Sequence, residues 1–455
     1  MQTFQTINPY TGEVLETYRH LLPHEAVLVI EQAHVSFLNW KTQTPVNRAA
    51  VLNRMASAFR KNNRPLSQII GREMGKPLQQ GRDEVEKCAV ALEYFAECGP
   101  EFLKPQDVDG PYEKNQIYLQ PQGVILAIMP WNFPLWQAIR FAAPALMAGN
   151  TIVLKPADIT AGSSKAMIAI MKGIFPSELI LDAPMSHETC AEVMAHPRIR
   201  GVTFTGSTSA GRKIAEVAGK NLKKIVLELG GSDAYLVLKD ADLMKAAEIC
   251  AKARMINSGQ SCVAAKRFIV EEAVFDQFVE LFKQEMEKIK FGNPMQVDIQ
   301  FGPLASKKFQ KMVSDQVESL KGDGGKVILG GECPSGEGSF YPTTIMVFEE
   351  NFPELGSEEI FGPVALVIKA KSADDAVKIA NSSIYGLGGA IFSNDLARAQ
   401  ALALQIESGI VIINNQVKSD PRIPFGGVKD SGYGRELSVY GLQEFCNVKT
   451  VGTNS

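Results

Sequence analysis

The sequence predicts an α/β protein with two parallel sheets and a small additional β element. Short apolar stretches alternate with helical stretches along the chain, first up to Gly230 and then again after Gly231. This alternation is typical of parallel sheets that carry helices on both faces. The chain has 455 residues, which is enough for two or three domains and a large core.

The first series follows an N-terminal part that is expected to be mostly helical, with helices over 47–61 and 83–98. A strand-like stretch over 115–119 precedes residues 124–129, which are apolar throughout, as in a strand buried on both faces. The remaining elements expected in this series are strands at Thr151–Leu154, Val202–Thr205 and Ile225–Leu229, and helices at 161–173 and 208–220.

The second series begins after Gly231 and repeats the alternation. Its clearest helix spans 272–290, where Phe275, Phe278 and Phe282 fall on one face. Because one series ends and the next begins there, we expect a domain boundary at Gly230-Gly231. The other elements expected are strands over 234–238, 268–270, 364–369, 388–393 and 409–413, and a helix over 241–255.

Composition and charge exclude several classes of protein. The formal net charge is −3 and no run of about five Lys or Arg occurs, which argues against nucleic acid or an anionic membrane as a partner. No apolar run reaches about eighteen residues, so no membrane span is expected, and the N-terminus lacks the pattern of a signal peptide. The seven cysteines and five histidines show no ligand spacing. We therefore expect a cytoplasmic protein with reduced thiols and without a metal.

A cysteine and a glutamate carry the strongest indication of chemistry. Cys262 lies in Ser-Gly-Gln-Ser-Cys, and Glu228 ends an expected strand and is followed by Leu-Gly-Gly. A thiolate attacks a carbonyl, and a carboxylate moves the protons of that reaction. A nearby cation or helix N-terminus is expected to lower the pKa of the Cys262 thiol, and Gly259 to let a substrate approach. The alternatives are a buried apolar cysteine and a structural, ion-paired glutamate.

Asn132 is the candidate for oxyanion stabilisation. It lies in Pro-Trp-Asn-Phe-Pro, between an expected buried strand and a helix. Its side-chain amide would donate a hydrogen bond to an oxyanion, alongside the backbone N–H of Cys262. The alternative is a helix N-cap, which is a common role for asparagine.

Three segments suggest a dinucleotide site. Lys155 follows an expected strand, and Thr205–Gly211 joins a strand to a helix whose N-terminus suits a pyrophosphate. The spacing in the second segment is Gly-x-x-x-x-Gly, which differs from the usual Gly-x-Gly-x-x-Gly turn. Glu359 would accept hydrogen bonds from a ribose, with Phe361 packed beside it. Each segment has an alternative when it is considered alone. Lys155 would be a surface lysine, Thr205–Gly211 an ordinary capped helix start, and the segment around Glu359 a loop with a Gly-Pro turn.

In this order the motifs resemble those of the NAD(P)-dependent aldehyde dehydrogenase superfamily, and the match runs over nearly the whole chain. The resemblance implies that Cys262 is the nucleophile, Glu228 the general base and Asn132 the oxyanion donor. It also implies a thiohemiacetal on the cysteine, loss of a hydride to a nicotinamide, and hydrolysis of the resulting thioester. The residues that would hold NAD or NADP are Trp131, Lys155, Asp158, Gly206, Ser207, Leu229, Glu359 and Phe361.

The resemblance implies a fold of three parts, in which a β flap serves for oligomerisation. The flap would pair the strands before Gly123 with Asn447–Val451, and homodimers or homotetramers are typical of the superfamily. The implied parts are a dinucleotide-binding domain over 1–104 and 123–230, a catalytic domain over 231–430, and the flap over 105–122 and 431–455.

Two local stretches, 128–137 and 426–438, are similar to those of bacterial succinate-semialdehyde dehydrogenases. Arg140 lies eight residues after Asn132, and Trp136 shares its helix face. An arginine there would clamp the distal carboxylate of a short semialdehyde through two hydrogen bonds. The alternative for Arg140 is a structural ion pair.

The chain departs from one branch of those enzymes, which carries a second arginine six residues before the cysteine. Ile256 occupies that position here, and Arg254 lies two residues further away. The polar loop 418–422, which contains Ser419 and Arg422, is the expected substitute.

The choice of cofactor and several rival functions stay open at this stage. Asp158 stands where NAD-preferring relatives often place a glutamate, and its charge would repel a 2′-phosphate, which favours NAD over NADP. The nearest rival is an aldehyde dehydrogenase for an uncharged aliphatic, aromatic or amino aldehyde. A second rival is an enzyme that transfers the acyl group to coenzyme A. Such an enzyme would not need Glu228 as a base, so the presence of Glu228 argues against it. The remaining rivals are a non-redox thiol hydrolase and a non-catalytic binding protein.

Overall fold

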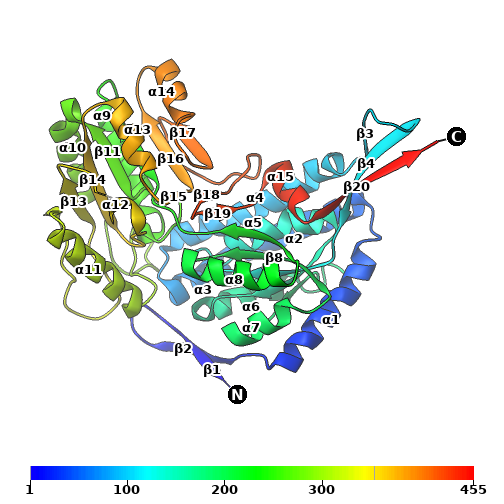
Figure 1. The fold of residues 1–455 in the computed structure, drawn as a ribbon. Helices are drawn as coiled ribbons and strands as arrows, with labels where there is room; N and C mark the ends of the chain where they lie inside the picture. Colours follow the sequence, from blue (N-terminus) through cyan, green and yellow to red (C-terminus); the bar gives the residue numbers. More distant parts are fainter. Residues whose placement is uncertain (1, 353, 455) are drawn as a thin grey trace.

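The structure is a computed structural model and describes residues 2–352 and 354–454. Figure 1 shows two α/β lobes side by side and a narrow β extension that carries the C-terminus away from them. Each lobe is built around one sheet that is mostly parallel, as the alternation in the sequence predicts. Over the described residues, no helix is long and apolar enough to cross a membrane.

The first lobe contains a six-stranded sheet in the order β19-β9-β8-β5-β6-β7. The five strands from β9 to β7 are parallel and only the edge strand β19 is antiparallel. The strands are β5 (Val124–Ile128), β6 (Thr151–Lys155), β7 (Ile180–Asp182), β8 (Ile199–Thr205), β9 (Lys224–Glu228) and β19 (Gly432–Tyr433).

Burial on both faces explains why β5 is apolar throughout. Ile125 and Ala127 belong to one core cluster, whereas Val124 and Leu126 belong to the cluster on the other face. The first face is covered by α2 (Pro45–Lys61), α3 (Asn63–Met74), α4 (Leu78–Phe102), α5 (Trp136–Ala148) and α6 (Ala161–Met171). The second face is covered by α1 (Pro23–Trp40), α7 (His187–Met194) and α8 (Thr208–Lys220).

The second lobe contains a seven-stranded sheet in the order β12-β13-β14-β11-β10-β16-β17, in which only β12 is antiparallel. Alternate residues of β10 again enter different core clusters, with Leu236 on one face and Tyr235 on the other. The strands are β10 (Ala234–Val237), β11 (Arg267–Glu271), β12 (Lys326–Leu329), β13 (Thr344–Phe348), β14 (Val364–Ala370), β16 (Gly388–Phe392) and β17 (Ile410–Ile413).

Helices cover both faces of this second sheet. Helices α9 (Leu243–Met255) and α10 (Phe275–Glu287) contribute to the core on one face. The opposite face carries α11 (Lys307–Gly322), α12 (Glu354–Ser357), α13 (Ala373–Asn381) and α14 (Leu396–Ala403). The expected helix over 272–290 begins as a 3-10 turn at Glu272–Val274 and becomes α-helical only from Phe275.

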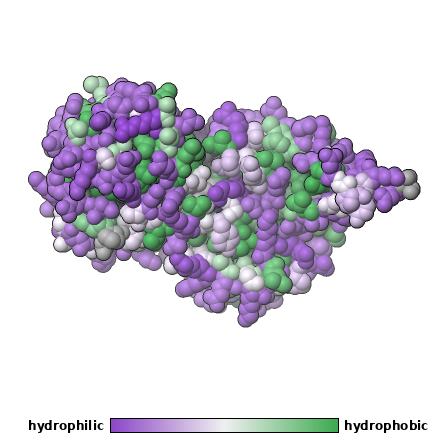
Figure 2. All heavy atoms as spheres, turned by 45° about the horizontal axis from the view of Figure 1, so that its top comes forward, coloured by the Kyte–Doolittle hydropathy of each residue, from purple (hydrophilic) through white to green (hydrophobic). Residues whose placement is uncertain are grey.

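The extension is a three-stranded antiparallel sheet in which β20 (Cys446–Thr453) pairs with β4 (Lys114–Pro121), and β4 pairs with β3 (Gln106–Asp107). Seven of the eight β20 residues are exposed. The face of the whole molecule in Figure 2 is mainly hydrophilic, with scattered hydrophobic residues. Because β20 is an edge strand, its outer backbone groups are available to a further strand.

The N-terminal part differs from the sequence prediction because it opens with strands. The hairpin of β1 (Thr3–Ile7) and β2 (Val14–Arg19) precedes the helices. Its turn contains Gly12 at φ +77°, a value that glycine adopts at little cost. The remaining short elements are β15 (Tyr385–Gly386), β18 (Val428–Lys429) and α15 (Ser438–Glu444).

A buried carboxylate fixes the start of α5 from a neighbouring helix. Glu84 on α4 accepts hydrogen bonds from the backbone N–H groups of Leu135 (2.9 Å) and Trp136 (3.0 Å), two donors that no residue within the helix satisfies. The same carboxylate forms an ion pair with Lys76, and both side chains are almost fully buried. Lys76 also donates a 2.8 Å hydrogen bond to the carbonyl oxygen of Asn132. The segment that precedes α5 is therefore held by α4.

We expect the variant Glu84→Gln to lower the free energy of unfolding by about 3–5 kcal/mol, because it leaves the Lys76 ammonium buried without its counter-charge. The matched control is Glu86→Gln, which removes an exposed ion pair with Arg60 two residues further along α4 and should cost about 1 kcal/mol or less. Urea denaturation followed by circular dichroism measures both values. Equal losses in the two variants would contradict the role of the Glu84–Lys76 pair.

Candidate active site

Cys262 lies in a loop between α9 and β11 whose backbone is unusual. Asn257 and Ser258 have φ values of +53° and +58°, which cost non-glycine residues about 1–3 kcal/mol each. Hydrogen bonds fix this conformation. The Asn257 amide donates to the carbonyl oxygen of Asn132 (2.8 Å), and the Ser258 hydroxyl donates to that of Gly302 (3.1 Å). A strained loop that its surroundings hold in place is typical of a functional site.

The role expected for Gly259 requires a correction. The residue does turn the chain, with φ at +75°. However, a Cβ at this position would collide with the backbone of Gly362 and Pro363. The close neighbour is therefore another chain segment, not a substrate.

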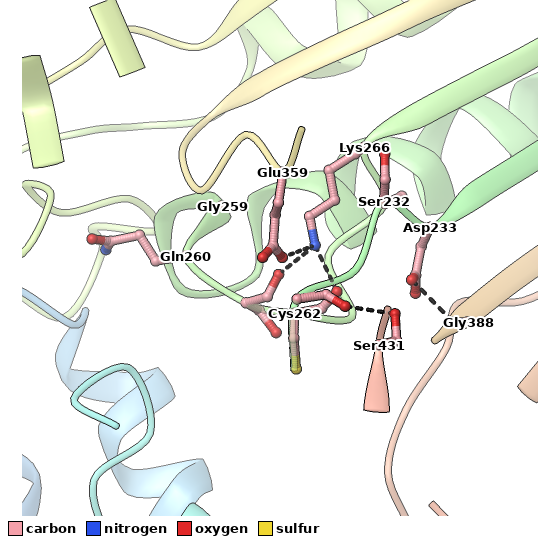
Figure 3. Close-up of polar contacts among 12 residues, drawn as sticks. Ser232, Asp233, Gly259, Gln260, Cys262, Lys266, Glu359, Gly388 and Ser431 are labelled. Carbon is pink, nitrogen blue, oxygen red and sulfur yellow. Dashed lines mark hydrogen bonds and ion pairs between the residues drawn. The ribbon is translucent and has the colours of Figure 1, made fainter. Parts of the chain in front are cut away.

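Lys266 organises the loop, although it was not among the site residues predicted from the sequence. Its ammonium donates hydrogen bonds to the carbonyl oxygens of Ser261 (2.8 Å) and Cys262 (2.6 Å) and forms an ion pair with Glu359 at 3.0 Å (Figure 3). The side chain is 1 % exposed, so the ion pair and hydrogen bonds compensate a charge that burial disfavours. A lysine directly before the buried strand β11, four residues after Cys262, is the sequence signal that would have identified it.

Two cavities meet at the cysteine. One has a volume of about 630 Å³ and the other of about 490 Å³. Cys262 and Gln137 line both of them. The thiol is therefore accessible from two sides, as a reaction between two bound molecules requires.

The smaller cavity contains most of the cofactor candidates. The Trp131 and Phe361 rings stand nearly perpendicular, with centroids 5.7 Å apart. Ser207 is the N-cap of α8, so this cavity reaches a helix N-terminus, where an anion is favoured. A Cβ at Gly206 would come within 2.5 Å of the Phe204 ring, which leaves room there only for glycine. The candidates that line this cavity are Trp131, Gly206, Ser207, Leu229, Glu359 and Phe361.

Lys155 and Asp158 do not line this cavity, although they lie at the same edge of the sheet. Lys155 ends β6, and its carbonyl oxygen accepts a 3.0 Å hydrogen bond from the N–H of Met129. Asp158 begins the 3-10 turn η1 (Asp158–Thr160), and Nε2 of His20 lies 3.1 Å from its carboxylate. Aromatic, hydroxyl, anion-binding and carboxylate groups along one edge fit an elongated dinucleotide. His20, which contacts Asp158, was not among the site residues predicted from the sequence.

Asn132 is not a helix cap in this structure. Helix α5 begins at Trp136 with Leu135 as its N-cap residue. The Asn132 amide instead donates a 3.1 Å hydrogen bond to the carbonyl oxygen of Gln260. Asn132 is 4 % exposed and lines the smaller cavity together with Cys262. The alternative role suggested by its sequence position is therefore excluded, and its role as an oxyanion donor stays a prediction.

Glu228 ends β9, as the sequence predicts, but it lines neither cavity. Its carboxylate is 2 % exposed and lies where a Cβ at Gly426 would be 2.7 Å from Oε1. Burial raises the pKa of Glu228 well above its usual value, and the charge of Glu436 raises it further. The carboxyl group is therefore favoured in its neutral form, and only its ionised form contributes to the raised pKa of the Cys262 thiol.

Burial also decides the protonation state of Cys262, the candidate nucleophile. It raises the pKa of the Cys262 thiol to about 11, and the Glu359 and Glu228 charges act in the same direction. Arg140 and Lys266 act in the opposite direction, but their effect is smaller than that of burial. The expected lowering of the thiol pKa is therefore absent, because desolvation outweighs the nearby cations. No helix begins at Cys262 to compensate it.

The larger cavity contains the three residues proposed for the substrate. Trp136, Arg140 and Ser419 all line it, together with Cys262. The guanidinium of Arg140 forms an ion pair with Glu436, and both side chains are 2 % exposed. It also lies 4.6 Å from the centre of the Phe425 ring. The structural ion pair is therefore present, and the substrate clamp stays a prediction.

The other arginines considered from the sequence lie outside this cavity. Arg254 is fully buried and donates hydrogen bonds to the carbonyl oxygens of Ala265 (2.8 Å) and Gly259 (2.6 Å). Arg422 is exposed and paired with Asp420 at 2.7 Å. Ile256 lines the cavity as an apolar residue. Over the described residues, no group of three or more His, Cys, Asp or Glu is placed to hold a metal ion.

Comparisons with known proteins agree with this geometry. The model of the aldehyde dehydrogenase family matches residues 1–451. A succinate-semialdehyde dehydrogenase [NADP(+)] of Deinococcus radiodurans is 39 % identical over 454 residues, covering 98 % of this chain and 94 % of that protein. An aldehyde dehydrogenase of Paenarthrobacter nicotinovorans is 40 % identical and covers 99 % of both chains.

A solved structure supports the same assignment. The succinic semialdehyde dehydrogenase of Streptococcus pyogenes, in complex with NADP+, superposes with a TM-score of 0.96 at 36 % identity. The match covers 99 % of this chain and 100 % of that one. The fold, the thiol between two cavities and these relatives lead to one conclusion: the chain belongs to the aldehyde dehydrogenase family and is an NAD(P)-dependent oxidoreductase.

Proposed function

We propose that the protein oxidises succinate semialdehyde to succinate. The observation that carries the proposal is the larger cavity, in which Cys262 shares a largely apolar wall with two cationic side chains, Lys87 and Arg140. A short chain with an aldehyde at one end and a carboxylate at the other matches that distribution of groups. The names of the Deinococcus and Streptococcus relatives support the same substrate.

The proposed reaction uses the three candidate catalytic residues in turn. The thiol of Cys262 gives its proton to water, and the thiolate adds to the aldehyde carbon, whose oxygen takes the electron pair of the C=O bond. The resulting oxyanion accepts hydrogen bonds from the backbone N–H of Cys262 and the amide of Asn132. A nicotinamide cofactor, when bound in the smaller cavity, would accept the hydride that leaves the carbon as the thioester forms. Glu228, once ionised and turned toward the cavities, takes a proton from the water that hydrolyses the thioester, and the Cys262 thiolate leaves.

We also propose the domain organisation and assembly suggested by the sequence, with one correction. Residues 432–445 belong to the six-stranded lobe and not to the extension, because β19 pairs with β9 and Leu442 and Phe445 lie in the core of that lobe. The six-stranded lobe would bind the dinucleotide, the seven-stranded lobe would carry the nucleophile, and the extension would join identical chains. The free edge of β20 supports the last role, because an exposed edge strand readily pairs with another strand. Val448 and Val451 on that strand are 60 % and 40 % exposed, and subunit contact would bury them.

An aldehyde panel assayed with NAD and with NADP tests the proposed function. We expect kcat/KM for succinate semialdehyde to exceed that for hexanal by about 30-fold or more, because charged hydrogen bonds to the carboxylate stabilise the bound substrate. The variant Cys262→Ala should abolish turnover, whereas Cys333→Ala, at an exposed cysteine, should not change it. Comparable kcat/KM values for the two aldehydes would instead favour an enzyme for uncharged aldehydes.

The raised pKa of the nucleophile predicts a pH dependence. In the protein without ligands, the rate of alkylation of Cys262 by iodoacetamide should rise about tenfold per pH unit from pH 7, since only the thiolate reacts. No plateau is expected before the thiol pKa of about 11. Peptide mass spectrometry measures the rate at Cys262 alone. A plateau near pH 7 would show that the nearby cations outweigh burial.

The position of Asp158 predicts a cofactor preference that a single substitution should change. A carboxylate near a 2′-phosphate opposes NADP, so Asp158→Ser should lower the KM for NADP by about tenfold. The KM for NAD should change by less than about threefold, because NAD carries no 2′-phosphate. Steady-state kinetics with each cofactor provides both constants. An unchanged ratio of the two KM values would show that Asp158 does not face the adenosine ribose.

A further inference from the structure

Lys87 places its ammonium inside the larger cavity, next to two residues already considered for the substrate. It projects from α4, and its Nζ lies 4.3 Å from the centre of the Trp136 ring. It donates a 2.7 Å hydrogen bond to the hydroxyl of Ser419. Cys262 lines the same cavity. Residues distant in the sequence thus bring a cation, a hydroxyl and an aromatic face to one wall.

The positive charge of Lys87 is less compensated by nearby carboxylates than that of Arg140. Arg140 forms a buried ion pair with Glu436. In the part of the chain that the structure describes, by contrast, Lys87 has no carboxylate at ion-pair distance, and its one hydrogen bond goes to Ser419. An ammonium has three donors, so two stay available to a ligand. Lys252 and Lys418 also line the cavity, but at exposed positions where water and salt screen their charges.

We propose that Lys87, with Ser419 beside it, binds the distal carboxylate of the aldehyde substrate and thereby selects short aldehydes with a terminal carboxylate. The inference rests on the proposed function and identifies the specificity-determining cation of that site. Ser419 would donate its hydroxyl proton to the second carboxylate oxygen. Arg140 contributes a second contact, because Glu436 engages its Nε and leaves its Nη2 without a hydrogen-bond partner among the described residues.

The protonation of Lys87 provides an independent signature. Burial, followed by the positive charge of Arg140 on α5, lowers the pKa of Lys87 to about 8. Cys88 and Glu84 on α4 and Asp420 in the neighbouring loop act in the opposite direction. Lys87 is therefore cationic below pH 8 and becomes neutral above it. Binding of a carboxylate should weaken as the pH rises through this value, and binding of an uncharged aldehyde should not.

The test compares Lys87→Met with Lys87→Arg, using succinate semialdehyde and butanal, which have the same chain length. Lys87→Met keeps the apolar stem and removes the charge. It should raise the KM for succinate semialdehyde by about 30-fold and change kcat and the KM for butanal by less than about threefold. Lys87→Arg should restore most of the affinity for succinate semialdehyde. It should also remove the rise in KM above pH 8, because arginine keeps its charge.

Lys252→Met is the comparison for general attraction, since it removes the same charge from an exposed position that lines the cavity outside the loop 418–422. Its effect on the KM for succinate semialdehyde should be smaller than about threefold. Equal effects of Lys252→Met and Lys87→Met, or equal losses for succinate semialdehyde and butanal in Lys87→Met, would overturn the assignment of Lys87. If the parent protein itself does not prefer succinate semialdehyde to butanal, the proposed function fails, whatever Lys87 does. Retained butanal turnover shows that the Lys87→Met variant is folded.

Discussion

The buried ammonium of Lys266 connects the nucleophile loop to the cofactor side of the site, and the positions of both depend on it. It binds the carbonyl oxygens of Ser261 and Cys262 and pairs with Glu359 from the segment before β14. A charge that is 1 % exposed tolerates no loss of these partners. The carboxylate expected to face the cofactor ribose and the backbone that carries the thiol are therefore held by one side chain. The lysine also fixes a loop whose positive φ values would not persist without such contacts.

The same burial that fixes this geometry keeps the reacting groups neutral. Desolvation is the largest cause of the raised pKa of both Cys262 and Glu228. The protein without ligands thus holds a protonated thiol and favours a protonated carboxyl group, which protects the thiol from side reactions.

The larger cavity shows how pairing decides which cation is available to a ligand. Arg140 and Lys87 both line it, and the arginine has the geometry best suited to a carboxylate. Glu436 already engages that arginine, whereas Lys87 contacts only a hydroxyl and an aromatic ring among the described residues. The proposed recognition of an anionic substrate therefore relies more on the charge of Lys87 than on that of the paired Arg140.

The sequence by itself determined the two parallel sheets, because buried strands such as β5 must be apolar on both faces, and it placed Cys262 in the second α/β unit, after the boundary at Gly230-Gly231. It also predicted cofactor residues after strand ends, where ligands bind in such sheets, and six of these eight candidates line the smaller cavity. The tertiary structure alone decided that Glu84 caps α5, that Glu436 pairs with Arg140, and that Lys87 and Lys266 reach the site. These contacts join residues far apart along the chain or depend on the path of a loop, and no local periodicity encodes them. The pKa values of Cys262 and Glu228 were likewise decided by tertiary burial, because desolvation depends on what surrounds a group in space.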